Sequence, residues 1–331
     1  MSDTTLNATG SESIADTRLH DIVVGVDGSD ESFAALRWAL NEASLTGQQV
    51  NAVFAWSHSW DMGSEPEDEE QWAEVRHDIA QRLRDWVSEA SQGMTLNEDH
   101  VKLTSVKATG TSALLEIGRD AQQIVVGRRS LGRVARWFLG SLSASLAEAA
   151  EVPVTVVRIL DDEESNVQDA IANALTPSEN TVTYDLPGSP LPRSQRPIVV
   201  GVDGSETSRH ALRFAIDLAA LHHAPLQVMF CWQLKDLGVI EGYENAIAPI
   251  AVGQERAERI LDELLDSVEI PAAGIPDDFQ IESHAFHISA AKGLIAASRY
   301  ARHLVVGSRG LSGLDAHFLG SVSKHTVTVV H

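Results

Sequence analysis

Short, uninterrupted apolar runs alternate along this chain with longer segments whose apolar residues recur at helical spacing. Residues 22–26, 50–56 and 124–126 have the length and the β-branched content that are typical of buried strands. Between the first two runs, residues 31–44 place their apolar side chains on one face of a helix. Strands that alternate with helices predict right-handed crossovers and a mainly parallel, doubly wound sheet.

This pattern is duplicated within the chain. The letters IVVGVDGS at residues 22–29 recur unchanged at residues 198–205, and Trp56 has a counterpart in Trp232 after a matched helix. A repeat of this length predicts two homologous domains, because it is far longer than a solenoid unit. We therefore expect two tandem α/β domains, each a five-stranded, mainly parallel sheet flanked by helices.

The repeats set the expected domain bounds at residues 19–158 and 196–331. Residues 1–18 are polar and acidic, and they predict a disordered tail. Residues 159–195 open with a run of acidic residues and close in a proline-containing stretch, which is typical of a linker.

Composition narrows the classes of function. A formal charge of −22 over 331 residues argues against nonspecific nucleic-acid binding, which requires clustered lysine and arginine. No apolar run reaches the length of a membrane span, and the polar N-terminal residues lack the pattern of a secretory signal. The single cysteine, Cys231, excludes an internal disulfide and fits a reducing compartment. We expect a cytoplasmic protein that binds neither nucleic acid nor membrane.

A glycine loop follows the fourth strand of each repeat. In the second repeat it runs from Gly307 to Gly310 and, after nine further residues, to Gly320 and Ser321. Glycine at these positions lets backbone N–H groups converge on an anion, and Ser321 is placed to cap the next segment. The spacing therefore predicts a nucleotide phosphate site.

The first repeat carries the same loop with one change. Gly127, Gly140 and Ser141 match, whereas Ser130 stands where the second repeat has Gly310. If that position requires a positive φ, serine costs roughly 1 kcal/mol or more, and its side chain crowds a phosphate. Its hydroxyl can instead donate a hydrogen bond, so both outcomes stay open for the first site.

The turn after the first strand of each repeat is the second candidate element. It contains Asp27 in one copy and Asp203 in the other, each followed by glycine and serine. Taken alone, each aspartate is better explained as a helix cap. Because both elements recur at the carboxyl ends of strands, where open α/β sheets bind ligands, the duplication favours a shared ligand site.

These motifs together resemble the universal stress protein family, over residues 19–158 and 197–331. The resemblance implies an ATP-binding fold of five parallel strands. It implies that the aspartate after strand one lies near the adenosine, that the glycine loop wraps the phosphates and that the end of strand two lines the adenine pocket. Whether Mg²⁺ accompanies ATP stays open.

Position by position, the resemblance gives two sets of nucleotide-binding residues. In the first repeat they are Gly25, Val26, Asp27, Ala55, Gly127, Arg129, Gly140 and Ser141. In the second they are Gly201, Val202, Asp203, Cys231, Gly307, Arg309, Gly310, Gly320 and Ser321. The two loop arginines match the family's usual arginine and would neutralise phosphate charge.

The C-terminus departs from the first repeat. Residues 327–330 follow Ser321 several positions sooner than residues 154–157 follow Ser141, so about two helical turns are missing. We expect a very short last helix, and a final strand that pairs differently from its counterpart or frays. The sequence does not rank the two sites.

Enzymatic chemistry has little support in the sequence. The chain lacks a G-x-x-x-x-G-K-[S/T] loop and a paired nucleophile and base, so we assign no catalytic residue. Histidines such as His222 and His284 lack metal-ligand spacing and are expected on exposed surfaces, so we assign no metal site.

The leading hypothesis is an ATP-binding regulator of a stress response. The alternatives are a slow ATPase or phosphate-transferring protein that uses Asp27 or Asp203, and an interaction scaffold that has lost nucleotide binding. A phosphoacceptor receiver domain is disfavoured, because the acidic cluster and downstream lysine that it requires are not recognisable. We expect the domains to pack as an intrachain pair, with further homodimerisation and the protein partner left open.

Overall fold

The computed structural model confirms a tandem α/β fold. It describes residues 21–56, 68–94, 100–128, 141–159, 196–269, 276, 279–307 and 326–330. None of the helices in these segments is long and apolar enough to cross a membrane.

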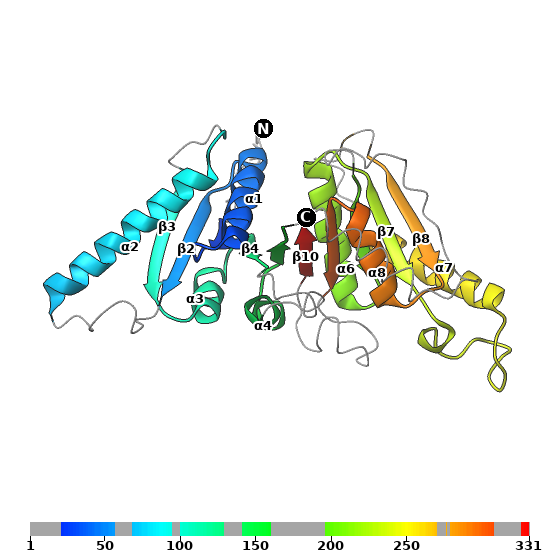
Figure 1. Ribbon diagram of the computed structural model, residues 1–331. Coiled ribbons are helices and arrows are strands. Elements are labelled where there is room, and N and C mark those ends of the chain that lie inside the picture. The colour runs from blue at the N-terminus through cyan, green and yellow to red at the C-terminus, as the bar shows by residue number, and fades with distance from the viewer. Residues whose placement is uncertain are drawn as a thin grey trace, which may run out of the picture.

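The elements of the two halves follow one another in the same order up to the fourth strand of each half, apart from one short 3₁₀ helix in the second half (Figure 1). The first half contains β1 (Ile22–Gly25), α1 (Asp30–Thr46), β2 (Val50–Trp56), α2 (Glu69–Ala90), β3 (Val101–Lys107), α3 (Gly110–Ile117), β4 (Gln123–Gly127), α4 (Ser141–Ala149) and β5 (Val154–Val157). The second half contains β6 (Ile198–Val202), α6 (Glu206–Leu221), β7 (Leu226–Cys231), the 3₁₀ helix η4 (Leu234–Asp236), α7 (Ile250–Asp266), β8 (Ile281–Phe286), α8 (Ala290–Tyr300), β9 (His303–Gly307) and β10 (Thr326–Val330).

The strands of the described segments join one ten-stranded sheet in the order β3-β2-β1-β4-β5-β10-β9-β6-β7-β8. Strands β1 to β5 are mutually parallel, and so are β6 to β9. Strand β10 lies between the halves, parallel to β5 and antiparallel to β9 (Figure 1). The strands of the two halves therefore run in opposite directions, and their carboxyl ends lie at opposite edges of the sheet.

The last strand, β10, pairs differently from its counterpart β5, which was one of the two outcomes that the sequence predicted, the other being fraying. Strand β5 is parallel to β4, with Ile124 opposite Val154, whereas in β10 Val327 lies opposite Val306 of the antiparallel neighbour β9. A parallel neighbour requires a crossover, usually a helix, and an antiparallel neighbour does not. The shorter connection before β10, residues 308–325 against residues 128–153 in the first half, favours the antiparallel arrangement. The expected short last helix falls in residues outside the described part.

Strands β1, β4, β5, β6 and β9 are buried on both faces, which accounts for their uninterrupted apolar runs, whereas β3 and β8 at the two sides of the sheet are partly exposed. Alternate residues of β1 face different helices: Val24 packs in a cluster with Leu36 of α1 and Leu83 of α2, whereas Val23 packs in a cluster with Leu114 of α3. The latter cluster continues into the second half, where it contains Leu304, Val306 and Ala297. One apolar core therefore extends across both halves of the chain.

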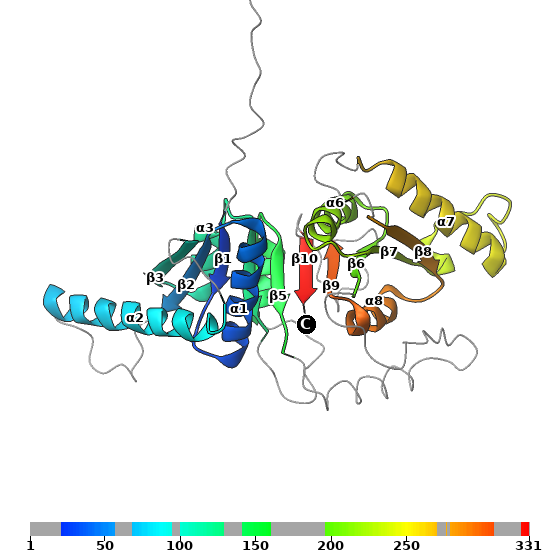
Figure 2. The same cartoon turned by 90° about the horizontal axis from the view of Figure 1, so that it is seen from above.

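A polar contact between the halves joins α1 to the residue that follows α6, and Figure 2 shows these two helices on either side of β5 and β10. The imidazole of His222, the residue that ends α6, bonds to Glu42 of α1, and its side chain is only 3% exposed. The expectation that the histidines lie on exposed surfaces is therefore wrong for His222. Its acidic partner is 180 positions away in the sequence, so local pattern does not reveal the burial.

The first turn of α1 packs directly against the end of β4 at Gly127. A Cβ built on Gly127 would lie 2.2 Å from the backbone oxygen of Glu31. Because backbone atoms occupy that space, a side chain at Gly127 would force the strand and the helix apart.

We predict that Gly127→Ala lowers the free energy of unfolding by about 1–3 kcal/mol, because the added methyl group overpacks this junction. The matched control is Gly110→Ala, whose methyl group would meet only Leu142 Cδ1 at 3.6 Å. Urea denaturation of both variants checks the prediction. Equal stability of the two variants would contradict the packing role of Gly127.

Candidate functional site

The turn after β1 places an exposed carboxylate at the carboxyl edge of the first half. Val26 directly follows β1 and is still bonded to the neighbouring strand, since its N–H donates to the backbone oxygen of Val53 at 2.9 Å and its side chain is buried. Asp27 follows it and is exposed. Predicted site residues Val26 and Val202 therefore direct their side chains into the two cores, and only their backbone faces the edge.

Serine, not aspartate, caps the helix that follows each turn. The Ser29 hydroxyl accepts a hydrogen bond from Ser32 N at 3.2 Å, and Ser205 accepts one from Ser208 N at the same distance. The aspartates instead organise the turn: Ser29 N donates to Oδ1 of Asp27 at 3.1 Å, and the equivalent bond to Asp203 is 3.0 Å. The helix-cap explanation of the two aspartates is therefore wrong.

Glycine is required in the first turn for two reasons. Gly28 has a φ of +84°, which side chains rarely adopt, and a Cβ there would lie 2.6 Å from the indole of Trp86. Trp86 also packs edge-on against Phe33 and Phe54, with ring centroids 6.2 Å and 5.2 Å apart. An aromatic cluster therefore supports the turn from the α2 side.

The helices that follow the two turns differ in charge. The first turn of α1 carries Asp30 and Glu31, whereas that of α6 carries Glu206 alone, with Thr207 in place of the second carboxylate. Acidic side chains stabilise a helix N-terminus by offsetting its dipole, and the same charge disfavours a second anion there. The two carboxyl edges are therefore not electrostatically equivalent.

The four predicted glycines within the described segments lie where neighbouring elements approach closely. A Cβ on Gly307 would lie 3.1 Å from the backbone carbon of Thr207, the counterpart of the contact between Gly127 and Glu31. Gly25 and Gly201 instead face leucine side chains of α3 and α8. The start of each glycine loop is thus in contact with the first turn of α1 or α6.

In the second half, neighbouring residues pack tightly around the end of the second strand, β7. Ala55 lies opposite Val106, and Cys231 lies opposite Phe286. A Cβ on Gly293 of α8 would lie 2.3 Å from Sγ of Cys231, so the thiol is packed against that helix. Burial raises the pKa of the Cys231 thiol to about 12, which makes it a neutral lining group and not a nucleophile.

Several predicted residues lie outside the described part of the chain. They are Arg129, Gly140, Arg309, Gly310, Gly320 and Ser321, together with Ser130. Ser141 is the first residue of α4. The structure thus brings together the turn after the first strand, the start of the glycine loop and the end of the second strand in each half.

An aromatic group at the end of β7 was not predicted as part of the site. The indole of Trp232 is fully buried and packs at 4.4 Å from the ring of His287. Its N–H donates to Oε1 of Gln254 at 3.1 Å. The sequence signal was the matched tryptophan itself, since Trp56 packs against Trp72 at the same place in the first half, with ring centroids 6.1 Å apart.

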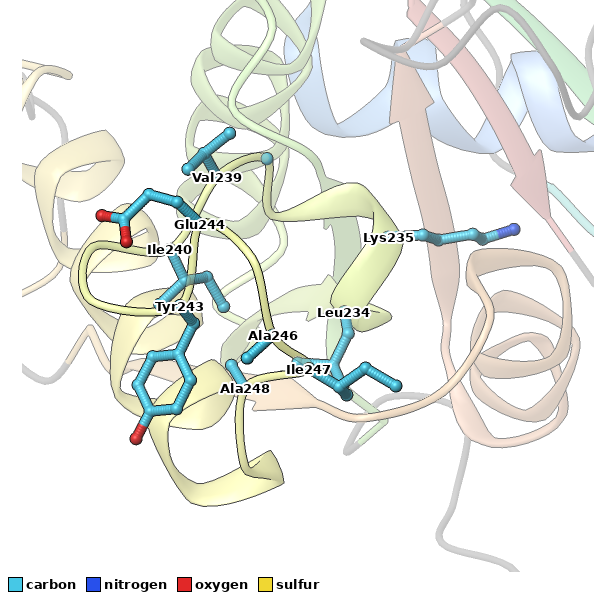
Figure 3. A pocket seen from close by; sticks show the side chains of 10 residues that line it. Leu234, Lys235, Val239, Ile240, Tyr243, Glu244, Ala246, Ile247 and Ala248 are labelled. Carbon is cyan, nitrogen blue, oxygen red and sulfur yellow. The ribbon is translucent and has the colours of Figure 1, made fainter.

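The segment between β7 and α7 forms a pocket of about 310 Å³, which sequence reasoning also missed (Figure 3). Leu234, Ile240, Tyr243 and Ala248 are among its lining residues. Ile247, which also lines it, is 88% exposed. The pocket includes none of the predicted nucleotide-binding residues. Over the described segments, no group of three or more histidine, cysteine or acidic residues is arranged to hold a metal.

Comparison with known proteins agrees with the geometry. Residues 19–158 and 195–331 match the model of the universal stress protein family. A universal stress protein of Mycolicibacterium smegmatis is 30% identical over 315 residues, which cover 92% of each chain. Universal stress protein Rv2005c of Mycobacterium tuberculosis is 28% identical over 309 residues, again 92% of each chain. The crystal structure of a universal stress protein from Archaeoglobus fulgidus has a TM-score of 0.53 at 15% identity, covering 94% of this chain and 97% of that one, which shows the fold.

We predict that a thiol reagent modifies native Cys231 at pH 8 on the order of 100-fold more slowly than in denaturant, because the thiolate is the reacting form. The folded thiol keeps its proton while the unfolded thiol ionises, so its contribution to stability is present below the unfolded pKa. That contribution falls as pH rises from about 9 toward the folded value of about 12. Comparing urea midpoints at pH 8 and pH 10 with those of Cys231→Ala isolates the effect. Equal modification rates in native and denatured protein would contradict it.

Proposed function

Because this chain belongs to the universal stress protein family, we propose that it is a cytoplasmic ATP-binding regulator of a stress response. ATP would sit at the carboxyl edge of each half and shift the population of conformations that a partner protein recognises. Its single cysteine agrees with a reducing compartment. Mg²⁺ can accompany the phosphates without a dedicated protein cage.

The duplicated aspartate turn is the observation that carries this proposal. Both copies have the same bond from serine N–H to aspartate Oδ1, and both glycines have a φ of +84°. Since Ser29 and Ser205 already cap the helices, capping does not explain the retained aspartates. Acidic side chains near the carboxyl ends of such strands are suited to ribose hydroxyl groups.

The glycine loops would supply the phosphate contacts. Each loop starts at a glycine in contact with the first turn of a helix, Gly127 against α1 and Gly307 against α6. Arg129 in the first half and Arg309 in the second would neutralise phosphate charge, while the later glycines would present backbone N–H groups. These assignments follow the family motif.

We propose further that the second half binds ATP more tightly. The loop start at Gly127 touches the backbone of Glu31, whereas the equivalent Gly307 touches that of Thr207. A carboxylate beside a phosphate repels it, and a hydroxyl does not. Such charge effects at a helix N-terminus amount to about 0.3–1 kcal/mol at exposed positions.

Two other functions compete with nucleotide-dependent regulation. A slow ATPase or phosphate-transferring protein would use Asp27 or Asp203, and it would show turnover above a glycine-loop variant. A scaffold that has lost nucleotide binding would keep the paired halves and show no tight ATP binding. The aspartate turn present in both halves argues against the scaffold, whereas the measurement of turnover separates the regulator from the ATPase.

We predict that calorimetric titration of nucleotide-free protein with ATP shows two binding events of unequal affinity, the tighter one in the second half. Mass spectrometry of the denatured protein first checks for co-purified nucleotide. Asp203→Ala should weaken the tighter event about tenfold, and the exposed control Asp262→Ala should leave both unchanged. Absence of binding and of co-purified nucleotide would overturn the proposed function in favour of the scaffold.

The charge difference is tested by exchanging the two side chains. Glu31→Thr should strengthen the weaker event about two- to fivefold, and Thr207→Glu should weaken the tighter one by a similar factor. Glu70→Thr, in the first turn of α2, controls for net charge. If Glu31→Thr and Glu70→Thr had the same effect, the local electrostatic explanation would fail, while the nucleotide site itself would stand.

A further inference from the structure

A buried cluster of polar side chains connects the two halves away from the proposed nucleotide sites. Glu42 comes from α1, His222 ends α6, and Arg302 immediately precedes β9. The His222 ring lies between the other two, with Nε2 3.0 Å from Oε2 of Glu42 and Nδ1 2.8 Å from Nη2 of Arg302. A single imidazole therefore joins a carboxylate of the first half to a guanidinium of the second.

The two partners determine the protonation state of the ring. A guanidinium can only donate hydrogen bonds, so Nδ1 of His222 must accept the one from Arg302 and carries no proton. A carboxylate can only accept, so Nε2 must carry the proton that it shares with Glu42. The observed geometry therefore requires neutral His222 in its Nε2–H form.

Two members of the cluster are shielded from water, and Arg302 is partly exposed. The side chains of His222 and Glu42 are 3% and 4% exposed. Burial lowers the pKa of the Arg302 guanidinium, and the negative charge of Glu42 acts in the opposite direction. With His222 neutral, the charges of Glu42 and Arg302 balance, which is the arrangement that a poorly solvated site favours.

A second proton on His222 would break this balance. Nδ1–H would then face the N–H of Arg302, so that hydrogen bond would be lost and two cations would share one carboxylate. Two further aromatic groups of the described segments lie near the ring, and neither carries a negative charge. His303, at the start of β9, is a second imidazole with its ring 5.1 Å away, and Trp38 of α1 packs against His303.

We propose that Glu42, His222 and Arg302 form a pH-sensitive clamp between the two halves, closed while His222 is neutral and loosened when it is protonated. The closed state binds fewer protons than the loosened state, so its relative stability falls as pH decreases. The clamp would alter the contact between the C-terminal ends of α1 and α6. The N-terminal ends of these helices follow the aspartate turns. It does not depend on nucleotide binding.

The tautomer is tested by long-range ¹H–¹⁵N correlation spectra of the histidine rings in the full chain, with His222→Asn for assignment. At pH 8 the expected spectrum has the unprotonated nitrogen of His222 at Nδ1 and the protonated one at Nε2. A ring protonated at Nδ1 at pH 8 would overturn the proposal.

The clamp is tested by electron paramagnetic resonance distances between spin labels at the exposed positions Asn41 of α1 and Asp217 of α6. Cys231 is the single cysteine and is partly exposed, so the labels are introduced in a Cys231→Ser background, in which only positions 41 and 217 carry a reactive thiol. The distance distribution should broaden or lengthen between about pH 8 and pH 5.5. His210→Asn, an exposed histidine on the same helix, should preserve that response, whereas His222→Asn should abolish it.

Arg302→Gln provides a second variant in case His222→Asn fails to fold. It removes the cation that makes protonation unfavourable, so the response to pH should shrink. The clamp would be overturned if the distance distribution were independent of pH in the labelled protein that keeps Glu42, His222 and Arg302. It would also be overturned if Arg302→Gln showed the same change in distance with pH as that protein.

Discussion

The arrangement of the two halves depends on the hydrogen bonding of β10. This strand pairs with β5 of the first half on one side and with β9 of the second half on the other. Without it, β5 and β9 would each present an unpaired strand edge, which is a template for association with other chains. With it, the strands form one continuous sheet, and the apolar cluster beneath it extends from Val154 to Leu304.

The direction of β10 also sets where chemistry can occur. Because β10 is parallel to β5 and antiparallel to β9, the two sets of carboxyl ends lie at opposite edges of the sheet. The duplicated turns are therefore separated by the sheet, and their contact with each other is indirect. Helices α1 and α6 start at these turns, and their C-terminal ends are joined by the hydrogen bond between Glu42 and His222. The two proposed sites are thus linked through helices α1 and α6 and the polar contact between them.

Much of the fold follows from local pattern. The apolar runs and the helical stripes predicted the strands and helices of both halves, since a strand buried on both faces leaves that signature. The direction of β10 could not be predicted from local pattern, because residues 154–157 and 327–330 have the same sequence, VTVV. Only the length of the connection distinguishes them, and it permitted fraying as well as a change of pairing.

The candidate site was predictable to a lesser extent. Duplication pointed to Asp27 and Asp203, and the structure adds that serine caps the helices. The burial of His222 was not visible, because Glu42 and Arg302 reach it from other elements. The close approach of Trp86 to Gly28 was hidden for the same reason. Tertiary contacts between residues far apart in sequence leave no local periodicity.

The central claim is that β10 joins the two halves by pairing parallel to β5 on one side and antiparallel to β9 on the other. Nuclear Overhauser effects between backbone protons of selectively labelled protein measure this directly. The account predicts Hα–Hα contacts between β10 and β9 in the register that places Thr328 opposite Val305, which only antiparallel strands bring close. Contacts of the parallel pattern between β10 and β9, or their absence together with free exchange of the β10 amides, would contradict it.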